Sequence, residues 1–225
     1  MSGKLFIIIP CYNEGEHIRN TLQELILSGY SNIIVVDDGS DTPIEDFVSD
    51  MNVHVLRHPI NLGQGAALET GMEYARRHDA DTVIHFDADG QHDASDIPAF
   101  LDALKDADMV IGSRFLTKEG VANVPTMRRL LLKIACFVNF IFCHIWLSDA
   151  HNGFRALNRK ALGAICIREN RMAHASEILI LAKKAKLRIK EVPTTIRYTD
   201  YSRQKGQKWY NSINIFLDLI LNQFM

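Results

Sequence analysis

The sequence has no excess of charge of either sign. Lysine and arginine number 25 and aspartate and glutamate 27, so the formal net charge is −2. A chain with this balance lacks the global positive field that holds nucleic acid, although a local basic cluster can still bind a phosphate group. We therefore expect no nucleic-acid partner, and any anion site must be confined to a few residues.

The sequence is also poor in cysteine. Its four cysteines, Cys11, Cys136, Cys143 and Cys166, form no CxxC pair and show no metal-ligand spacing. Most lie in apolar surroundings, where a thiol behaves as a small core residue, and this usage fits a reduced, cytoplasmic compartment. The apolar run in MSGKLFIIIP is too short for a signal peptide and is typical of a first strand.

No repeat, low-complexity tract or linker rich in Pro, Gly and Ser divides the chain. At 225 residues, with 47% hydrophobic and 23% charged residues, the composition is that of a globular protein and excludes general disorder. We expect one α/β domain over residues 1–208, followed by a C-terminal amphipathic helix at 209–225.

A long, uninterrupted apolar run is missing as well. The most apolar stretch, residues 130–147, contains Lys133, Asn139 and His144, and it is at the lower length limit for a membrane span. We interpret residues 127–148 as an interfacial or buried helix. The amphipathic pattern of residues 209–225 fits packing on the domain or docking on a membrane, and both readings stay open.

Short, β-branched apolar runs alternate with helical patterns in the first half of the chain. This alternation predicts a mostly parallel sheet covered by helices on both faces. The expected strands are residues 4–9, 32–36, 53–57, 82–86 and 109–111, and the expected helices are residues 16–27, 65–78 and 95–104.

Polar motifs follow three of these strands directly. They are PCYNE at residues 10–14, DDGS at 37–40 and DADGQ at 87–91. Ligands of open parallel sheets bind at the carboxyl ends of the strands. One acidic loop could be a helix cap, but three at successive strand ends favour a shared acidic cleft.

Asp87 and Asp89 are separated by one residue at the end of a buried strand. Two carboxylates with no neutralising lysine nearby raise the pKa of at least one of them unless a cation lies between them. Mg²⁺ or Mn²⁺ would resolve the repulsion, with Gln91 adding an amide oxygen. The alternative is a solvated, Asp-rich turn, because so short a motif has many false matches.

The segment NLGQG at residues 61–65 precedes an expected helix. It is not a dinucleotide fingerprint, because position 68, where a third glycine is required, is Leu68. The glycines would let the backbone pass close to a base or ribose, with Gln64 as a hydrogen-bonding side chain, or form a plain turn.

The motifs, in their order and spacing, resemble the family 2 glycosyltransferases of GT-A fold. Within that family the dolichol-phosphate mannose synthase and polyprenyl-phosphate glycosyltransferase branch is the most similar. The resemblance extends over residues 4–208. It is carried by IIIPCYNE, VVDDGS, NLGQGAA, HFDADGQH, VIGSRF, DAHNGFRAL and YTDYSRQKGQ.

The resemblance implies roles for individual residues. The metal ligands would be Asp87, Asp89 and Gln91, holding Mg²⁺ or Mn²⁺ against the donor diphosphate. Asp149 would lie near the transferred sugar, as a base or an acceptor-positioning group, and Asp89, Asp149 and Arg114 would be the catalytic set. The nucleotide-sugar would contact Pro10, Tyr12, Glu14, Asp38, Gln64, Asp87 and Ala88.

Basic residues that follow the metal motif are candidates for phosphate binding, since a guanidinium meets phosphate with two parallel N–H groups. Arg114, Arg128 and Arg203 are the arginines we favour, and Arg128, Arg203 and Lys205 are expected at the acceptor phosphate. The basic loop at 202–208 matches the GESK-like loop of dolichol-type enzymes only loosely, which leaves the acceptor open.

The expected reaction is an inverting transfer from a UDP- or GDP-linked sugar to a polyprenyl phosphate at the cytoplasmic face of a membrane. The alternatives are transfer to a sugar hydroxyl of a glycan precursor and a non-catalytic nucleotide-sugar-binding subunit. A haloacid-dehalogenase phosphatase is disfavoured, because three strands precede the DADG motif and position 91 is Gln91. Peripheral membrane contact is expected, and a homo-oligomer stays open.

Overall fold

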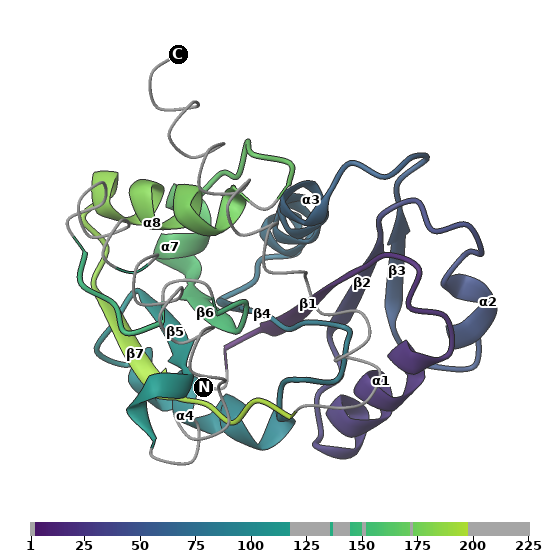
Figure 1. Cartoon of the computed structure of the whole chain (residues 1–225), viewed down its shortest axis with the longest axis horizontal. Coiled ribbons are helices and arrows are strands. Elements are labelled where there is room, and N and C mark those ends of the chain that lie inside the picture. The colour runs from purple at the N-terminus through teal and green to yellow at the C-terminus, as the bar shows by residue number, and fades with distance from the viewer. Residues whose placement is uncertain (1–2, 118–135, 137–144, 150–151, 172, 198–225) are drawn as a thin grey trace.

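A seven-stranded sheet lies at the centre of the computed structural model, which describes residues 3–117, 136, 145–149, 152–171 and 173–197 (Figure 1). The strand order in these residues is β3-β2-β1-β4-β6-β5-β7. The strands are β1 (Leu5–Cys11), β2 (Ile33–Asp37), β3 (His54–Arg57), β4 (Thr82–His85), β5 (Met109–Ser113), β6 (Arg155–Asn158) and β7 (Ile189–Pro193).

Helices cover both faces of the sheet (Figure 1). One face packs against α3 (Gln64–Arg77), α7 (Arg159–Ala164) and α8 (His174–Lys184). The other face packs against α1 (His17–Leu27), α2 (Glu45–Val48) and α4 (Ile97–Ala103). Short 3-10 helices, η1 (Ala94–Asp96) and η2 (Arg114–Leu116), precede α4 and follow β5.

Burial on both faces explains the continuous apolar runs of the strands. In β1, Phe6 and Ile8 enter the core under α3, whereas Ile7 and Ile9 enter the core under α1. A strand covered on one side alone would alternate apolar and polar residues instead. The expected α/β architecture is therefore confirmed, and each expected strand or helix begins and ends within two residues of the observed one.

The direction of β6 was not expected from the sequence. This strand pairs antiparallel with both β4 and β5, whereas the other neighbouring strands pair in parallel. Arg155, its first residue, lies opposite His85 on one side and Ile111 on the other. The start of β6 therefore lies at the edge of the sheet where β4 and β5 end.

Several predicted features fall outside the described residues. These are the helix at 209–225, the basic side chains of Arg128, Arg203 and Lys205, and the segment 127–148 apart from residue 136 and residues 145–148. Among the helices that the structure does describe, none has the length and apolar character needed to cross a bilayer.

Close packing of α3 on β1 gives a first prediction. A Cβ atom at Gly71 would lie 2.3 Å from Ile8 Cγ2, whereas a Cβ atom at Gly163, in α7, would meet no atom within 4 Å. We expect Gly71→Ala to lower the free energy of unfolding by about 1–3 kcal/mol through overpacking. Gly163→Ala should instead raise it by about 0.5–1 kcal/mol through helix propensity. Urea unfolding of the two variants would reveal opposite signs, and a stabilised Gly71→Ala would contradict the packing.

Candidate active site

The three polar motifs expected at strand ends come together at one edge of the sheet. The Asn13 backbone N–H donates to Ser40 Oγ at 2.9 Å, and the Asn13 and Asp41 side chains and backbone exchange two further hydrogen bonds. Thr21 Oγ1 donates to the carbonyl oxygen of Ala88 at 3.0 Å, which ties the third motif to α1. The order along the sheet thus converts three separate sequence motifs into one site.

The residues expected around the nucleoside differ in accessibility. Tyr12 is 41% exposed, whereas Glu14 and Ala88 are buried and Pro10 lies within β1. Ala88 is only 4% exposed, so little of this residue is available for contact with a ligand.

Asp38 is a buried carboxylate that shapes the neighbouring loop. It accepts hydrogen bonds from His58 Nδ1 at 2.7 Å and from the backbone N–H groups of Leu62 at 2.9 Å and Gly63 at 2.7 Å. Asp38 therefore fixes the backbone of the NLGQG segment, a contribution that its place in the DDGS motif did not reveal.

The glycines of NLGQG do make the close backbone approach that the sequence suggested, and their partner is the chain itself. A Cβ atom at Gly65 would lie 1.9 Å from the Glu169 carbonyl oxygen, and one at Gly63, whose φ is +107°, would lie 2.4 Å from the Asn170 carbonyl oxygen. Position 63 also has the positive φ that glycine tolerates best. The start of α3 is thus pressed against residues 169–170.

The Asp87 carboxylate is held from three directions. Gln64 Nε2 donates to its Oδ1 at 3.2 Å, and His92 Nε2 contacts its Oδ2 at 2.9 Å. The backbone of Gly153 passes so close that an added Cβ atom would lie 2.6 Å from Oδ2. The Gln64 side chain, expected near the nucleoside base, is therefore directed in this structure at Asp87 of the segment Asp87-Ala88-Asp89, the DxD motif.

His92 is a site residue that the sequence analysis missed. Its ring is 3% exposed and packs edge-on against Phe86 and at a tilt against Phe154. Its Nδ1 atom is buried without a hydrogen-bond partner among the described residues, while Nε2 contacts Asp87. The only sequence signal was its place at the end of HFDADGQH, where a histidine could equally have been a surface residue.

The pKa values of the two aspartates of the DxD motif are shifted in opposite directions. Burial alone would raise the pKa of Asp87, but the charge and hydrogen bond of His92, together with the charges of His174 and Arg155, lower it below its ordinary value. Burial, followed by the charge of Asp87, raises the pKa of Asp89 to about 6, and Glu14 adds to this effect. The expected repulsion between the two carboxylates is therefore present.

The carboxylate pair offers a divalent cation oxygen atoms rather than a complete protein cage. Asp89 Oδ1 accepts the Gln91 backbone N–H at 3.0 Å, while its Oδ2 accepts no hydrogen bond from the described residues. In the same residues no three His, Cys, Asp or Glu side chains converge as metal ligands. This donor set fits a hard cation that shares its coordination with substrate phosphates, as Mg²⁺ usually does.

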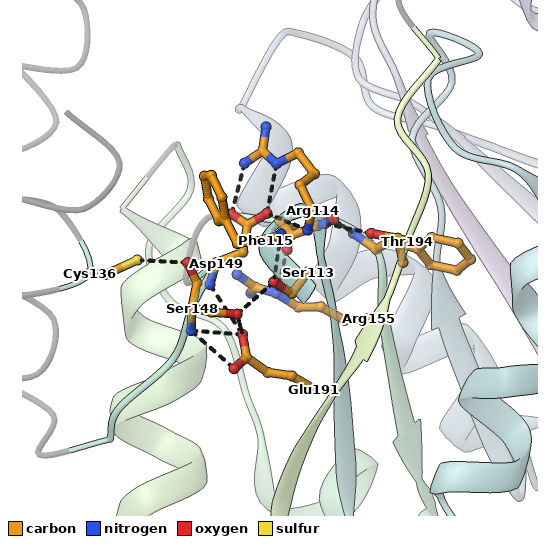
Figure 2. Close-up of polar contacts among 11 residues, drawn as sticks. Ser113, Arg114, Phe115, Cys136, Ser148, Asp149, Arg155, Glu191 and Thr194 are labelled. Atoms are coloured by element: carbon orange, nitrogen blue, oxygen red, sulfur yellow. Dashed lines mark hydrogen bonds and ion pairs between the residues drawn. The ribbon is translucent and has the colours of Figure 1, made fainter. Parts of the chain in front are cut away.

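Arg114 and Asp149 form a buried ion pair (Figure 2). Arg114 Nε donates to Asp149 Oδ2 at 2.6 Å and Nη2 donates to Oδ1 at 2.7 Å, while the Arg114 backbone N–H also donates to Oδ2 at 3.2 Å. The Asp149 side chain is fully buried and that of Arg114 is 10% exposed. Both carboxylate oxygens are thus engaged by one guanidinium.

The raised pKa of Asp89 predicts a pH-dependent stability. A carboxyl group with a folded-state pKa of about 6 and an ordinary pKa of 3.8 favours the folded state below pH 3.8, and this contribution is lost as the pH rises toward 6. In the absence of metal, the free energy of unfolding of Asp89→Asn should therefore exceed that of the wild type at about pH 8 by on the order of 1–3 kcal/mol, a range that allows for the partial exposure of Asp89. This difference should disappear near about pH 4. Urea unfolding in EDTA would measure the difference. Asp102→Asn, at an exposed carboxylate, is the matched control, and an equal gain there would contradict the assignment.

Known proteins are similar in sequence to most of this chain. Residues 6–166 match the model of the family described as Glycosyl transferase family 2. A UDP-N-acetylglucosamine–dolichyl-phosphate N-acetylglucosaminyltransferase of Methanococcus voltae is 32% identical and is matched over 98% of this chain and 97% of its own length. An undecaprenyl-phosphate mannosyltransferase of Micrococcus luteus is 31% identical over 85% of this chain and 83% of its own length.

The fold is similar to that of solved glycosyltransferase structures. Glucosyl-3-phosphoglycerate synthase from Mycobacterium tuberculosis, in complex with Mn²⁺, UDP and glucosyl-3-phosphoglycerate, matches with a TM-score of 0.67 at 17% identity, over 97% of this chain and 80% of that one. The GT-A fold implied by the sequence motifs is thereby confirmed. The chain belongs to glycosyltransferase family 2, and it is a glycosyltransferase built on the GT-A fold.

Proposed function

We propose that this glycosyltransferase moves a sugar from a UDP- or GDP-linked donor to a polyprenyl phosphate, with inversion at the anomeric carbon and with Mg²⁺ or Mn²⁺ as cofactor. The names of the Methanococcus voltae and Micrococcus luteus relatives, which act on dolichyl and undecaprenyl phosphate, support the class of acceptor. Both relatives match more than four fifths of this chain and of their own length.

The observation that carries the proposal is the pairing of Asp149 with Arg114. Transfer to a sugar hydroxyl needs a carboxylate base within hydrogen-bond reach of the acceptor. Asp149 was the candidate for that base, but its buried oxygens both accept hydrogen bonds from Arg114. A phosphate monoester is largely ionised at neutral pH, since its second pKa is about 6, and it needs no such base. The paired Asp149 therefore favours a phosphate acceptor.

The donor would lie over the carboxyl edge of β1, β2 and β4. Asp89 and Gln91 would hold the cation, with Asp87 kept in a fixed orientation by His92 and Gln64. A bound cation supplies positive charge where the departing nucleoside diphosphate becomes negative. Pro10, Tyr12, Glu14, Asp38 and Ala88 are the remaining residues that we assign to the donor.

Inversion follows from a single displacement. A phosphate oxygen of the acceptor forms a bond to the anomeric carbon while the bond to the donor diphosphate breaks on the opposite face. The motifs of the site provide no evident second nucleophile for a covalent sugar intermediate. Asp149 is the carboxylate that could act as such a nucleophile, but both of its oxygens accept hydrogen bonds from Arg114.

We place the enzyme at the cytoplasmic face of a membrane, with residues 1–208 as the catalytic domain. Segment 127–148 and the helix at 209–225 would contact the membrane surface, and Arg128, Arg203 and Lys205 would bind the acceptor phosphate. Trp146 belongs to residues 145–148, the part of this segment near its C-terminal end that the structure describes. It is 71% exposed, as an interfacial aromatic residue would be.

Donor binding tests the role of the carboxylate pair. Mn²⁺ together with UDP or GDP should raise the thermal midpoint of the wild type more than either component alone, because a ligand that binds only the native state stabilises it. Asp89→Asn should lose this synergy and at least about 100-fold in turnover, since a carboxylate ligand is removed. Asp102→Asn serves as the control. Unchanged cation affinity and turnover in Asp89→Asn would refute the proposed chemistry.

Acceptor chemistry provides the second test. With a radiolabelled nucleotide sugar, farnesyl phosphate should be glycosylated and farnesol should not, because only the phosphate arrives ionised and able to bind cationic side chains. Proton NMR of the product should show the anomeric configuration opposite to that of the donor. Transfer to a hydroxyl acceptor alone would favour the glycan alternative, and nucleotide binding without any transfer or donor hydrolysis would favour a non-catalytic subunit.

A further inference from the structure

We infer that Glu191 is a positioning residue of this site, which sets the orientation of Arg114 toward the acceptor phosphate by holding Ser148 and Asp149. This inference rests on the proposed phosphate acceptor. Glu191 lies in β7, opposite Ile111 of β5, and is outside every motif on which the family resemblance depends.

The Glu191 carboxylate accepts hydrogen bonds from two successive backbone N–H groups (Figure 2). The Ser148 N–H donates to Oε1 at 2.9 Å and to Oε2 at 3.0 Å, and the Asp149 N–H donates to Oε1 at 3.1 Å. The Ser148 hydroxyl contacts the same Oε1 at 2.9 Å. One carboxylate thus accepts the backbone N–H groups of Asp149, the first residue of the DAHNGF motif, and of Ser148 just before it.

Residues 145–149 depend on such contacts because they belong to no strand or helix. A segment without ladder hydrogen bonds takes its position from the side chains that bind it. Ser113 Oγ, at the end of β5, contacts Ser148 Oγ at 2.6 Å and adds a second anchor. Glu191 and Ser113 therefore place Asp149 from two neighbouring strands.

The position of Asp149 in turn determines the orientation of Arg114. The ion pair uses Nε and Nη2 of the guanidinium, so the plane of the carboxylate dictates the plane of the whole group. Figure 2 shows Nη1 on the side of the guanidinium that points away from Asp149. Asp149 thus fixes the plane of the guanidinium before any ligand binds, which lowers the ordering cost of binding a phosphate.

Glu191 itself is unsuited to touching the substrate, because its oxygens already accept from two backbone N–H groups and contact a hydroxyl. Its effect must pass through Ser148 and Asp149. Removing it would leave partly buried N–H groups without an acceptor, and each such group costs about 1–3 kcal/mol. The segment would then shift, and the Arg114 guanidinium would lose its fixed direction.

The test compares Glu191→Ala and Glu191→Gln with Lys190→Ala, a control on the same strand whose side chain pairs with the exposed Asp106. With farnesyl phosphate as acceptor, Glu191→Ala should raise the acceptor KM by about 10-fold or more, because Arg114 is no longer preorganised. Glu191→Gln keeps one carbonyl oxygen as an acceptor and should show a smaller rise. Calorimetric binding of UDP or GDP with Mn²⁺ should be the same in all four proteins.

A second readout is independent of the acceptor and of turnover. In ¹⁵N NMR the Arg114 Nε–H signal, identified by its loss in Arg114→Lys, should persist in Glu191→Gln and broaden or disappear in Glu191→Ala. An unchanged Arg114 signal and acceptor KM in Glu191→Ala would overturn the inference, as would an equal loss of nucleotide binding. If Glu191→Ala does not fold, Glu191→Gln decides, and an unaltered acceptor KM there would overturn it.

The two proposals fail in different ways. If the wild type transfers sugar only to hydroxyl acceptors, the proposed acceptor is wrong whatever the Glu191 variants do. If the wild type uses farnesyl phosphate but the Glu191 variants behave like Lys190→Ala, the acceptor stands and the positioning role of Glu191 is wrong.

Discussion

The antiparallel direction of β6 is the constraint on which the rest of the site depends. Because Arg155 at its start lies opposite both His85 and Ile111, the residues just before β6 arrive where β4 and β5 end. A parallel β6 would carry them to the opposite edge of the sheet. This direction brings Gly153 against the Asp87 carboxylate and Asp149 against Arg114, so motifs that are distant in sequence share one site.

The acidic side chains of the site and its buried guanidinium lie in two separate parts. Asp87 is kept ionised by His92, while burial and the charge of Asp87 make Asp89 the carboxylate that gains most from a cation. On the other side, Asp149 neutralises Arg114 inside the protein, where an unpaired charge would be costly. The acidic part suits a metal-bound diphosphate, and the guanidinium suits a second phosphate. This division is the physical basis of the proposed transfer from a nucleotide sugar to a phosphate acceptor.

Much of the fold could be predicted because its signals are local. An apolar β-branched run such as residues 32–36 indicates a buried strand by its own composition. A periodic segment such as residues 65–78 likewise indicates a helix by its own pattern. The DxD aspartates and their repulsion were also predictable, because the two carboxylates are separated by a single residue. Strands β6 and β7 and helices α7 and α8 were not predicted, since their patterns in the second half of the chain were weaker, and the short helix α2 was not predicted either.

The sequence alone therefore determined the five strands and three main helices of the first half of the chain, which family the motifs resemble, and that Asp87 and Asp89 would repel each other. Only the tertiary structure decided that β6 runs antiparallel, that His92 holds Asp87, and that Asp149 is paired rather than a free base. Glu191 belongs to this second group. These contacts join residues distant along the chain, and no local propensity or spacing encodes which distant partner a side chain meets; the packing of the whole sheet selects it.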